Sequence, residues 1–260
     1  MKKLAFLTLI FIFLVASCAE DNDDNLTAAN ATVHFNFTHN WDNTPVTNAD
    51  FNTIQYTNAN GENLSIEKLI YLISNVTFEK SNGETIVIPG YNLINLTTNS
   101  NLTYTPETRI PEGEYTNVSF TFGFNNTDNY GTNYPDLNTA LWSVPEMMGG
   151  GYHYMQLEGK FIDNSTAEIG YAYHAIRAVD MVSDAPNLIF EDTFFTVNLG
   201  AISISNNTTV EVKMNIAEWF KNPNQWDLNL LHTDLMSNFN AQVMMYENGQ
   251  NVFSLGTITP

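Results

Sequence analysis

The chain has 260 residues, of which 43% are hydrophobic and 13% aromatic, so it can bury a substantial core and wholesale disorder is excluded. Acidic residues outnumber basic ones by 28 to 9. This charge repels phosphate backbones, which excludes nucleic acid as a partner. A cation is the more natural partner, although acidic charge also serves solubility.

Residues 1–17 have the pattern of a bacterial lipoprotein signal peptide. Two lysines precede an apolar run, residues 4–15, which at about 1.5 Å per residue is too short to cross a ~30 Å hydrocarbon core. The sequence Val-Ala-Ser-Cys then ends at Cys18 and resembles a lipobox, where cleavage precedes the cysteine and the thiol receives lipid. We expect an exported protein of the cell envelope, anchored to the membrane on the periplasmic face or at the cell surface. Because Cys18 is the only cysteine, no intramolecular disulfide forms.

Residues 18–30 form an acidic spacer, and residues 31–260 are predicted to form one domain. Residues 33–39 alternate with period two, which places Val33, Phe35, Phe37 and His39 on one face of a strand. Residues 65–73 predict a strand or a short helix, and residues 76–88 predict a β-hairpin with Asn-Gly at its turn. Residues 115–124 predict a ten-residue strand.

Residues 125–151 are rich in Asn, Gly, Pro and Asp and predict a long loop, of the kind that is usually functional or mobile. Short helices are predicted around residues 217–220 and over residues 234–246, with Gly249 as a stop. The remaining strand-like segments are residues 152–161, 167–179, 193–199 and 209–216. Because strands dominate, we predict an all-β fold, namely an antiparallel β-sandwich with few short helices.

The motifs of phosphate-binding loops, zinc proteases and serine hydrolases are absent from the sequence. The best candidate for a catalytic group is His232 with Asp227 and Asp234. The spacing of these residues has no catalytic rationale, and the group lacks a nucleophile. We therefore assign no catalytic residues and expect that the protein is not an enzyme.

Histidines are the main candidate ligands, since neutral imidazole suits copper and zinc and can be supplied from different strands. His39 ends a predicted strand, His153 follows a run of three glycines, and His174 lies within a strand. Three methionines occur near His153 in the sequence, and a thioether is a soft ligand that suits Cu(I); they are Met147, Met148 and Met155. Taken singly, each of these residues is more simply explained by a structural role than by metal binding.

A second hypothesis is a calcium- or carbohydrate-binding surface module without copper. It depends on the Asn- and Asp-rich loop from Asn125 to Asp136 and on Tyr130 and Tyr134 as exposed aromatic residues. The loop departs from the EF-hand register, because Leu137 stands where a bidentate Glu is required.

Four motifs, taken in order, resemble the MbnP family of exported copper-binding proteins, which are related to the methanobactin-associated periplasmic protein. They are VHFNFTHNWD (residues 33–42), LIYLISNV (residues 69–76), GGYHYMQLEGKF (residues 150–161) and YAYH (residues 171–174). The resemblance implies an all-β fold and a mononuclear copper site held by histidines, with His39, His174 and His153 as the matching ligands. It also implies a role in copper acquisition or delivery.

In some members of that family a Trp oxidised to kynurenine completes the copper site, and a di-haem peroxidase-like partner of the MbnH type performs the oxidation. Many relatives carry this Trp just before the Gly-Tyr motif, where this chain has Met147-Met148-Gly149. Trp142 and Trp41 are the candidates for the modified residue here.

Overall fold

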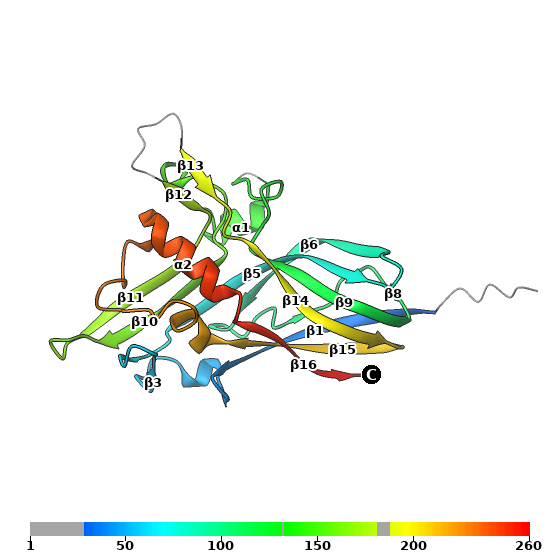
Figure 1. Ribbon diagram of the computed structural model, residues 1–260, viewed down its shortest axis with the longest axis horizontal. Helices are drawn as coiled ribbons and strands as arrows, with labels where there is room; N and C mark the ends of the chain where they lie inside the picture. Colours follow the sequence, from blue (N-terminus) through cyan, green and yellow to red (C-terminus); the bar gives the residue numbers. More distant parts are fainter. Residues whose placement is uncertain (1–28, 132, 181–187) are drawn as a thin grey trace, which may run out of the picture.

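Two curled β-sheets face each other across a shared apolar core (Figure 1). The computed structural model describes residues 29–131, 133–180 and 188–260. The expected signal peptide, Cys18 and nearly all of the acidic spacer lie outside the described residues. Strands make up 47% and helices 13%, so the predicted all-β class is confirmed.

The smaller sheet has the strand order β16-β15-β1-β2, with β7 and β8 also paired to β1. Most pairs are antiparallel as predicted, but β1 and β15 run parallel. The bounds are β1 Asn30–Trp41, β2 Thr44–Pro45, β7 Thr103–Tyr104, β8 Ile110–Pro111, β15 Asn207–Asn215 and β16 Phe253–Thr259.

The larger sheet has the order β14-β9-β5-β10-β4-β3, with β11 paired to β10 and β6 paired to β5. Its pairs are antiparallel. The bounds are β3 Tyr56–Thr57, β4 Asn63–Leu64, β5 Lys68–Glu79, β6 Thr85–Asn95, β9 Gly113–Phe122, β10 Met155–Ile162, β11 Glu168–Ala175 and β14 Phe195–Ile204.

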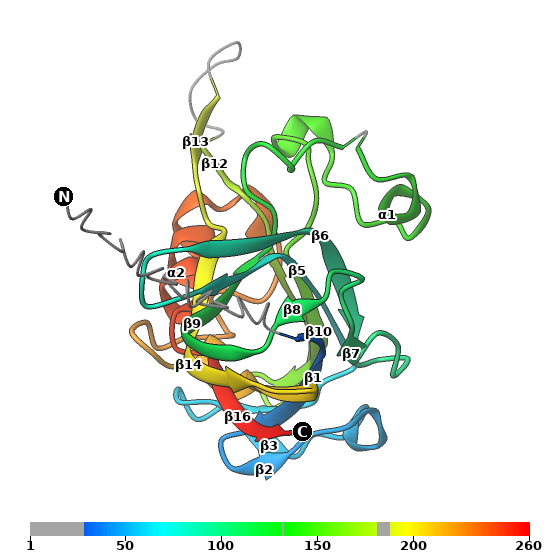
Figure 2. The ribbon, with the colours of Figure 1, turned by 90° about the vertical axis from the view of Figure 1, so that its right-hand side faces the viewer.

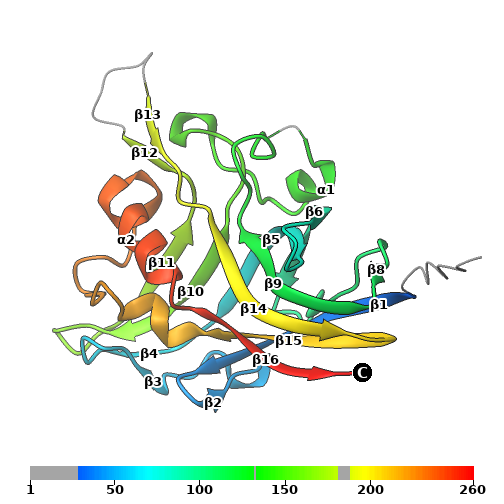
Figure 3. The same ribbon diagram turned by 45° about the vertical axis from the view of Figure 1, so that its right-hand side comes forward.

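A two-stranded ribbon and several short helices complete the fold. The ribbon stands at the same end of the molecule as the first α-helix, whereas the second α-helix lies across the strands (Figures 1 and 3). The elements are β12 Ala178–Asp180, β13 Ile189–Glu191, α1 Pro135–Thr139, α2 Phe239–Gly249 and the 3₁₀ helices η1 Asn48–Asp50, η2 Glu146–Met148, η3 Ile216–Phe220 and η4 Leu235–Ser237.

The strands predicted over residues 33–39 and 115–124 and the hairpin predicted over residues 76–88 are confirmed, and residues 68–73 of the segment 65–73 belong to strand β5 rather than to a helix. The second helix begins at Phe239, later than predicted, because the side chain of Asn238 caps it through the backbone N–H of Ala241. The loop predicted over residues 125–151 contains α1 and η2. In the described residues, no helix has both the length and the hydrophobicity needed to cross a bilayer.

Alternation along β1 directs Phe37 into the space between the sheets, where its ring lies 6.3 Å from Tyr71 of β5 and 6.2 Å from Phe120 of β9. A smaller cluster packs on the other face of the larger sheet, because Leu72 points away from the main core. Its other buried members are Phe124, Leu137, Trp142 and Tyr152. The segment 125–151 therefore covers part of the outer face of the larger sheet (Figure 2).

Candidate metal centre

The outer face of the larger sheet carries three charged or titratable side chains on three neighbouring strands. Lys68 of β5 lies directly opposite Glu158 of β10 in the strand register, and His174 of β11 lies diagonally beyond Glu158. Their neighbours Leu157 and Tyr173 are fully buried on the inner face. Because side chains alternate along a strand, Lys68, Glu158 and His174 share one face.

A short antiparallel turn brings Trp142 and His153 next to each other. Ser143 and Tyr152 form an isolated β-bridge, and both the backbone N–H and the ring Nδ1–H of His153 donate to the carbonyl of Trp142 at 3.0 Å. The indole of Trp142 then lies 5.6 Å from the imidazole of His153. This pairing fixes the ring of His153 relative to the backbone of Trp142.

Three consecutive glycines close the turn, and all three have positive φ angles. Gly151 has no room for a side chain, since a Cβ there would lie 2.5 Å from Oδ1 of Asn129. That same oxygen accepts a hydrogen bond from the backbone N–H of Tyr152 at 2.8 Å. The three glycines therefore allow the backbone turn that places His153 against Trp142.

His153 and His174 are adjacent, with ring centroids 5.4 Å apart and planes at 83°. His153 uses Nδ1 as a donor, and its buried Nε2 has no hydrogen-bond partner among the described residues. The ring Nε2 of His174 donates to Oε1 of Glu158 at 2.8 Å, which leaves Nδ1 as its lone-pair nitrogen. Each imidazole therefore keeps one nitrogen free to accept.

The spacing of these two rings fits a metal ion, and so does the charge state of His153. Two imidazoles bound to one metal at about 2.0 Å place their ring centroids roughly 5 Å apart at a tetrahedral angle. Burial lowers the pKa of His153 to about 4, so its ring is neutral at neutral pH. A neutral imidazole with a buried, unpartnered nitrogen is the form that binds copper or zinc.

Glu158 connects the pair to Lys68 at the edge of the site. Its carboxylate accepts from His174 and forms an ion pair with Lys68 at 3.0 Å. The hydrogen bond from His174, reinforced by Lys68, lowers the pKa of Glu158 to about 2, against the opposing effect of its burial. The carboxylate is therefore ionised, and it fixes the tautomer and orientation of the His174 ring.

His39, the third predicted ligand, does not join this pair. It lies on the inner face of β1, where its Nε2 is hydrogen-bonded to the hydroxyl of Tyr71 at 3.1 Å. Within the part of the chain that the structure describes, no three His, Cys, Asp or Glu side chains form a metal-binding group. A metal at this centre would therefore have two histidine ligands, completed by donors of other kinds.

The two candidate tryptophans are also separated. Trp142 contacts His153, and its Nε1 is, like Nε2 of His153, one of four buried side-chain atoms without a hydrogen-bond partner in the described residues. Trp41 stacks on Tyr56 with ring centroids 4.9 Å apart and packs near Phe220 in the main core. Only Trp142 lies beside the histidine pair.

The residues of the alternative hypotheses lie elsewhere. Asp128 accepts a hydrogen bond from Asn75, Asp136 accepts from the hydroxyl of Tyr91, and Tyr134 stacks on Phe124 within the smaller cluster. Tyr130 is exposed, as predicted.

His232, the histidine of the enzyme hypothesis, is bonded through Nδ1 to the carbonyl of Leu228 and packs near Phe161. Met155, expected near the histidines, is fully buried in the main core.

Sequence reasoning missed Glu158 and Met236 as neighbours of His174, and Lys68 as the ion-pair partner of Glu158. Met236 lines a pocket with His174 and Met148. Alternation within each predicted segment does assign Lys68 and Glu158 to one face of that segment. Their meeting depends on a register between strands about ninety positions apart, and that register is not visible in either strand alone.

The fold and this centre define an all-β protein in which a buried and a half-buried histidine lie side by side on the outer face of one sheet. The family model for MbnP matches residues 30–245, and the chain belongs to the MbnP family. Among solved structures, MbnP from Methylosinus trichosporium is similar, with 12% sequence identity and a TM-score of 0.48, over 74% of this chain and 78% of that chain. No curated protein matches the chain.

Proposed function

We propose that the protein binds one copper ion through Nε2 of His153 and Nδ1 of His174, with Trp142 beside them. The observation that carries the proposal is the buried, unpartnered Nε2 of His153 next to a second imidazole at a metal-compatible spacing. Membership of the MbnP family supports copper over zinc, because copper is the metal that the family resemblance implies. Bound copper would be cargo for acquisition or delivery.

Oxidation of Trp142 to kynurenine is the second part of the proposal. A ring-opened product would place an amine and a carbonyl close to His153 and so supply the additional donors that two histidines lack. A di-haem peroxidase-like partner of the MbnH type would catalyse the step with a peroxide as the oxidant: the indole C2–C3 bond breaks, C3 gains the ketone oxygen, and C2 leaves as formate to free the aromatic amine. Intact-mass analysis of the protein expressed with and without such a partner tests this step, and an unmodified Trp142 in both samples contradicts it.

Export and lipid anchoring through Cys18 place this copper site in the cell envelope. Labelling cells with a clickable fatty acid tests the anchor. The wild-type chain should take up the label, and the variant Cys18→Ser should not. Uptake by both chains, or by neither, contradicts anchoring at this residue.

Copper retention in single-histidine variants tests the site. His153→Ala and His174→Ala should each lower copper affinity by more than the roughly 10–100-fold expected of a change outside the ligands. His39→Gln is the matched control, since His39 is equally buried but bonded to Tyr71, and it should keep wild-type affinity. Loss of copper in His39→Gln, with retention in the other two variants, would refute the assignment.

A further inference from the structure

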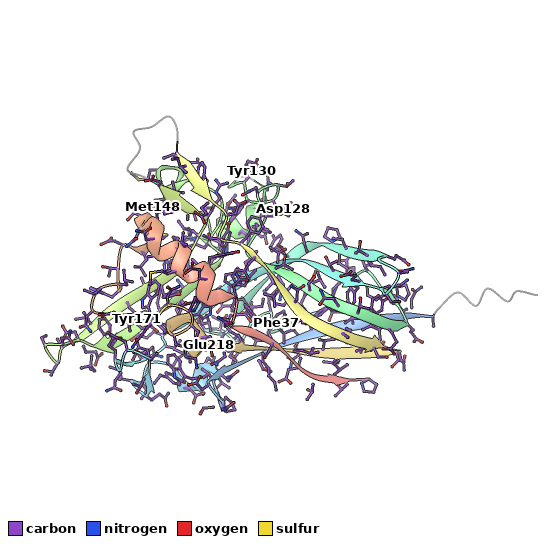
Figure 4. The ribbon with its side chains drawn as sticks, viewed as in Figure 1. Phe37, Asp128, Tyr130, Met148, Tyr171 and Glu218 are labelled. Atoms are coloured by element: carbon purple, nitrogen blue, oxygen red, sulfur yellow. The ribbon has the colours of Figure 1, made fainter. Side chains whose placement is uncertain are left out.

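A solvent-open pocket of about 180 Å³ lies beside His174. Besides His174, its lining includes Met148, the last residue of η2, and Met236, in the middle of η4, with Asp234 at its edge. The two methionines come from segments far apart in the sequence. In Figure 4, Met148 lies on the same side of the molecule as Tyr130 and Asp128, well away from Phe37 in the core.

These two methionines differ from the others that the structure describes around the core. Met155, Met214 and Met245 are fully buried in the main hydrophobic cluster. Met148 and Met236 are half-buried and belong to neither cluster of apolar side chains. Packing against the core therefore does not account for their position, whereas the shared pocket with an imidazole gives their thioethers a common neighbour.

The chemistry of this pocket favours a soft, singly charged cation. Thioether sulfur and neutral imidazole are preferred by Cu(I), whereas Cu(II) prefers nitrogen and oxygen donors. Glu158 occupies Nε2 of His174, so Nδ1 is the atom that remains for a metal. Asp234 adds a carboxylate to the lining, and the whole chain carries a formal charge of −19, so cations are attracted.

We propose that this pocket is a loading site for Cu(I), in which the thioethers of Met148 and Met236 and the imidazole of His174 hold the ion on its way to His153. Copper arrives and moves as Cu(I), so no electron transfer is involved. The final step rests on the proposed function, because it requires that His153 binds copper. Binding of a soft cation in the pocket does not require it.

Silver(I) titration tests the loading site, since Ag(I) has the charge and soft preference of Cu(I) and does not change oxidation state under these conditions. The full chain carries Cys18→Ser, so that no thiol competes, and its methionine methyl groups are labelled with ¹³C. The methyl signals of Met148 and Met236 should shift with the first equivalent of silver. Signals of Met155 and of Met147, which is 72% exposed, should stay in place. Unmoved signals of Met148 and Met236, or a shift confined to Met147, would overturn the proposal.

Variants separate this proposal from the copper site itself. Met148→Leu with Met236→Leu conserves side-chain volume and should lower silver affinity by more than about tenfold, because two of the three donors are lost. Met147→Leu is the control and should leave the affinity unchanged.

His153→Ala should abolish tight copper binding and still show the silver-induced shifts of Met148 and Met236. If the wild-type chain holds no copper at His153 but shows these shifts, the proposed function fails and the soft-cation site in the pocket stands. If copper binds at the histidines and the shifts are absent, the loading site fails alone.

Discussion

At the scale of single residues, two histidines with the same exposure differ in their hydrogen-bond partners. His39 and His153 are each 5% exposed, and burial lowers the pKa of both to about 4. His39 satisfies Nε2 with the hydroxyl of Tyr71, whereas Nε2 of His153 has no partner in the described residues. The sequence predicted the inward direction of His39 from strand alternation. It gave no sign of this difference in partners, which depends on residues from other strands.

The buried His39 makes stability depend on pH. Its pKa is near 6.5 in the unfolded chain and about 4 in the folded chain, so below pH 6.5 the unfolded chain binds a proton that the folded chain does not. Stability should therefore fall as the pH falls from 6.5 to 4. Between pH 7 and 4.5, urea unfolding of His39→Gln should show a loss smaller than that of wild type by about 2–3 kcal/mol. Equal losses in the two proteins would contradict a neutral, buried His39.

The glycine turn yields a prediction with a closely matched control. Gly151 has φ +79° and no room for a Cβ, whereas Gly83, in the β5–β6 hairpin, has φ +82° and open space around it. Gly83→Ala should cost roughly 1–3 kcal/mol, from the backbone conformation alone. Gly151→Ala should cost more, because it also displaces Asn129, and it should weaken copper binding. Equal destabilisation in thermal unfolding, with equal copper affinity, would show that the close approach at Gly151 is unimportant.

At the scale of elements, the strand patterns were predictable and their register was not. Period-two alternation identified the long strands, and the sequence named both His153 and His174. The two-residue strands β2, β3, β4, β7 and β8 are too short to show a period. The approach of Glu158 to His174 depends on the pairing of β10 with β11, in which His174 lies opposite Gln156 and diagonal to Glu158.

Removing the charge of Glu158 tests its role in orienting His174. Glu158→Gln keeps an acceptor oxygen but loses the carboxylate, so copper affinity should fall roughly 10–100-fold and the X-ray absorption spectrum of the bound copper should change. Glu168→Gln on the neighbouring strand is the control, since Glu168 pairs with the exposed Lys160. A wild-type affinity and spectrum for Glu158→Gln would mean that the Glu158–Lys68 ion pair stabilises the sheet and does not orient His174.

At the scale of the whole molecule, the two sheets enclose the main core and the His153–His174 pair lies outside it. The main core fills the space between the sheets, and His39 lies among the inward-facing residues of β1, between Phe37 and Trp41. The segment 125–151 packs its own small cluster on the outer face of the larger sheet and so brings Trp142 and His153 to His174. The sequence identified this segment as unusual but gave no indication of which face of which sheet it covers.

Anomalous diffraction at the copper edge, from crystals of the full chain loaded with one equivalent of copper, tests the central claim most directly. The predicted result is one strong peak between His153 and His174, about 2.0 Å from Nε2 of the first and Nδ1 of the second. A peak at His39, at the loop of Asp128 and Asp136, or at no protein site would contradict the assignment of copper to this histidine pair.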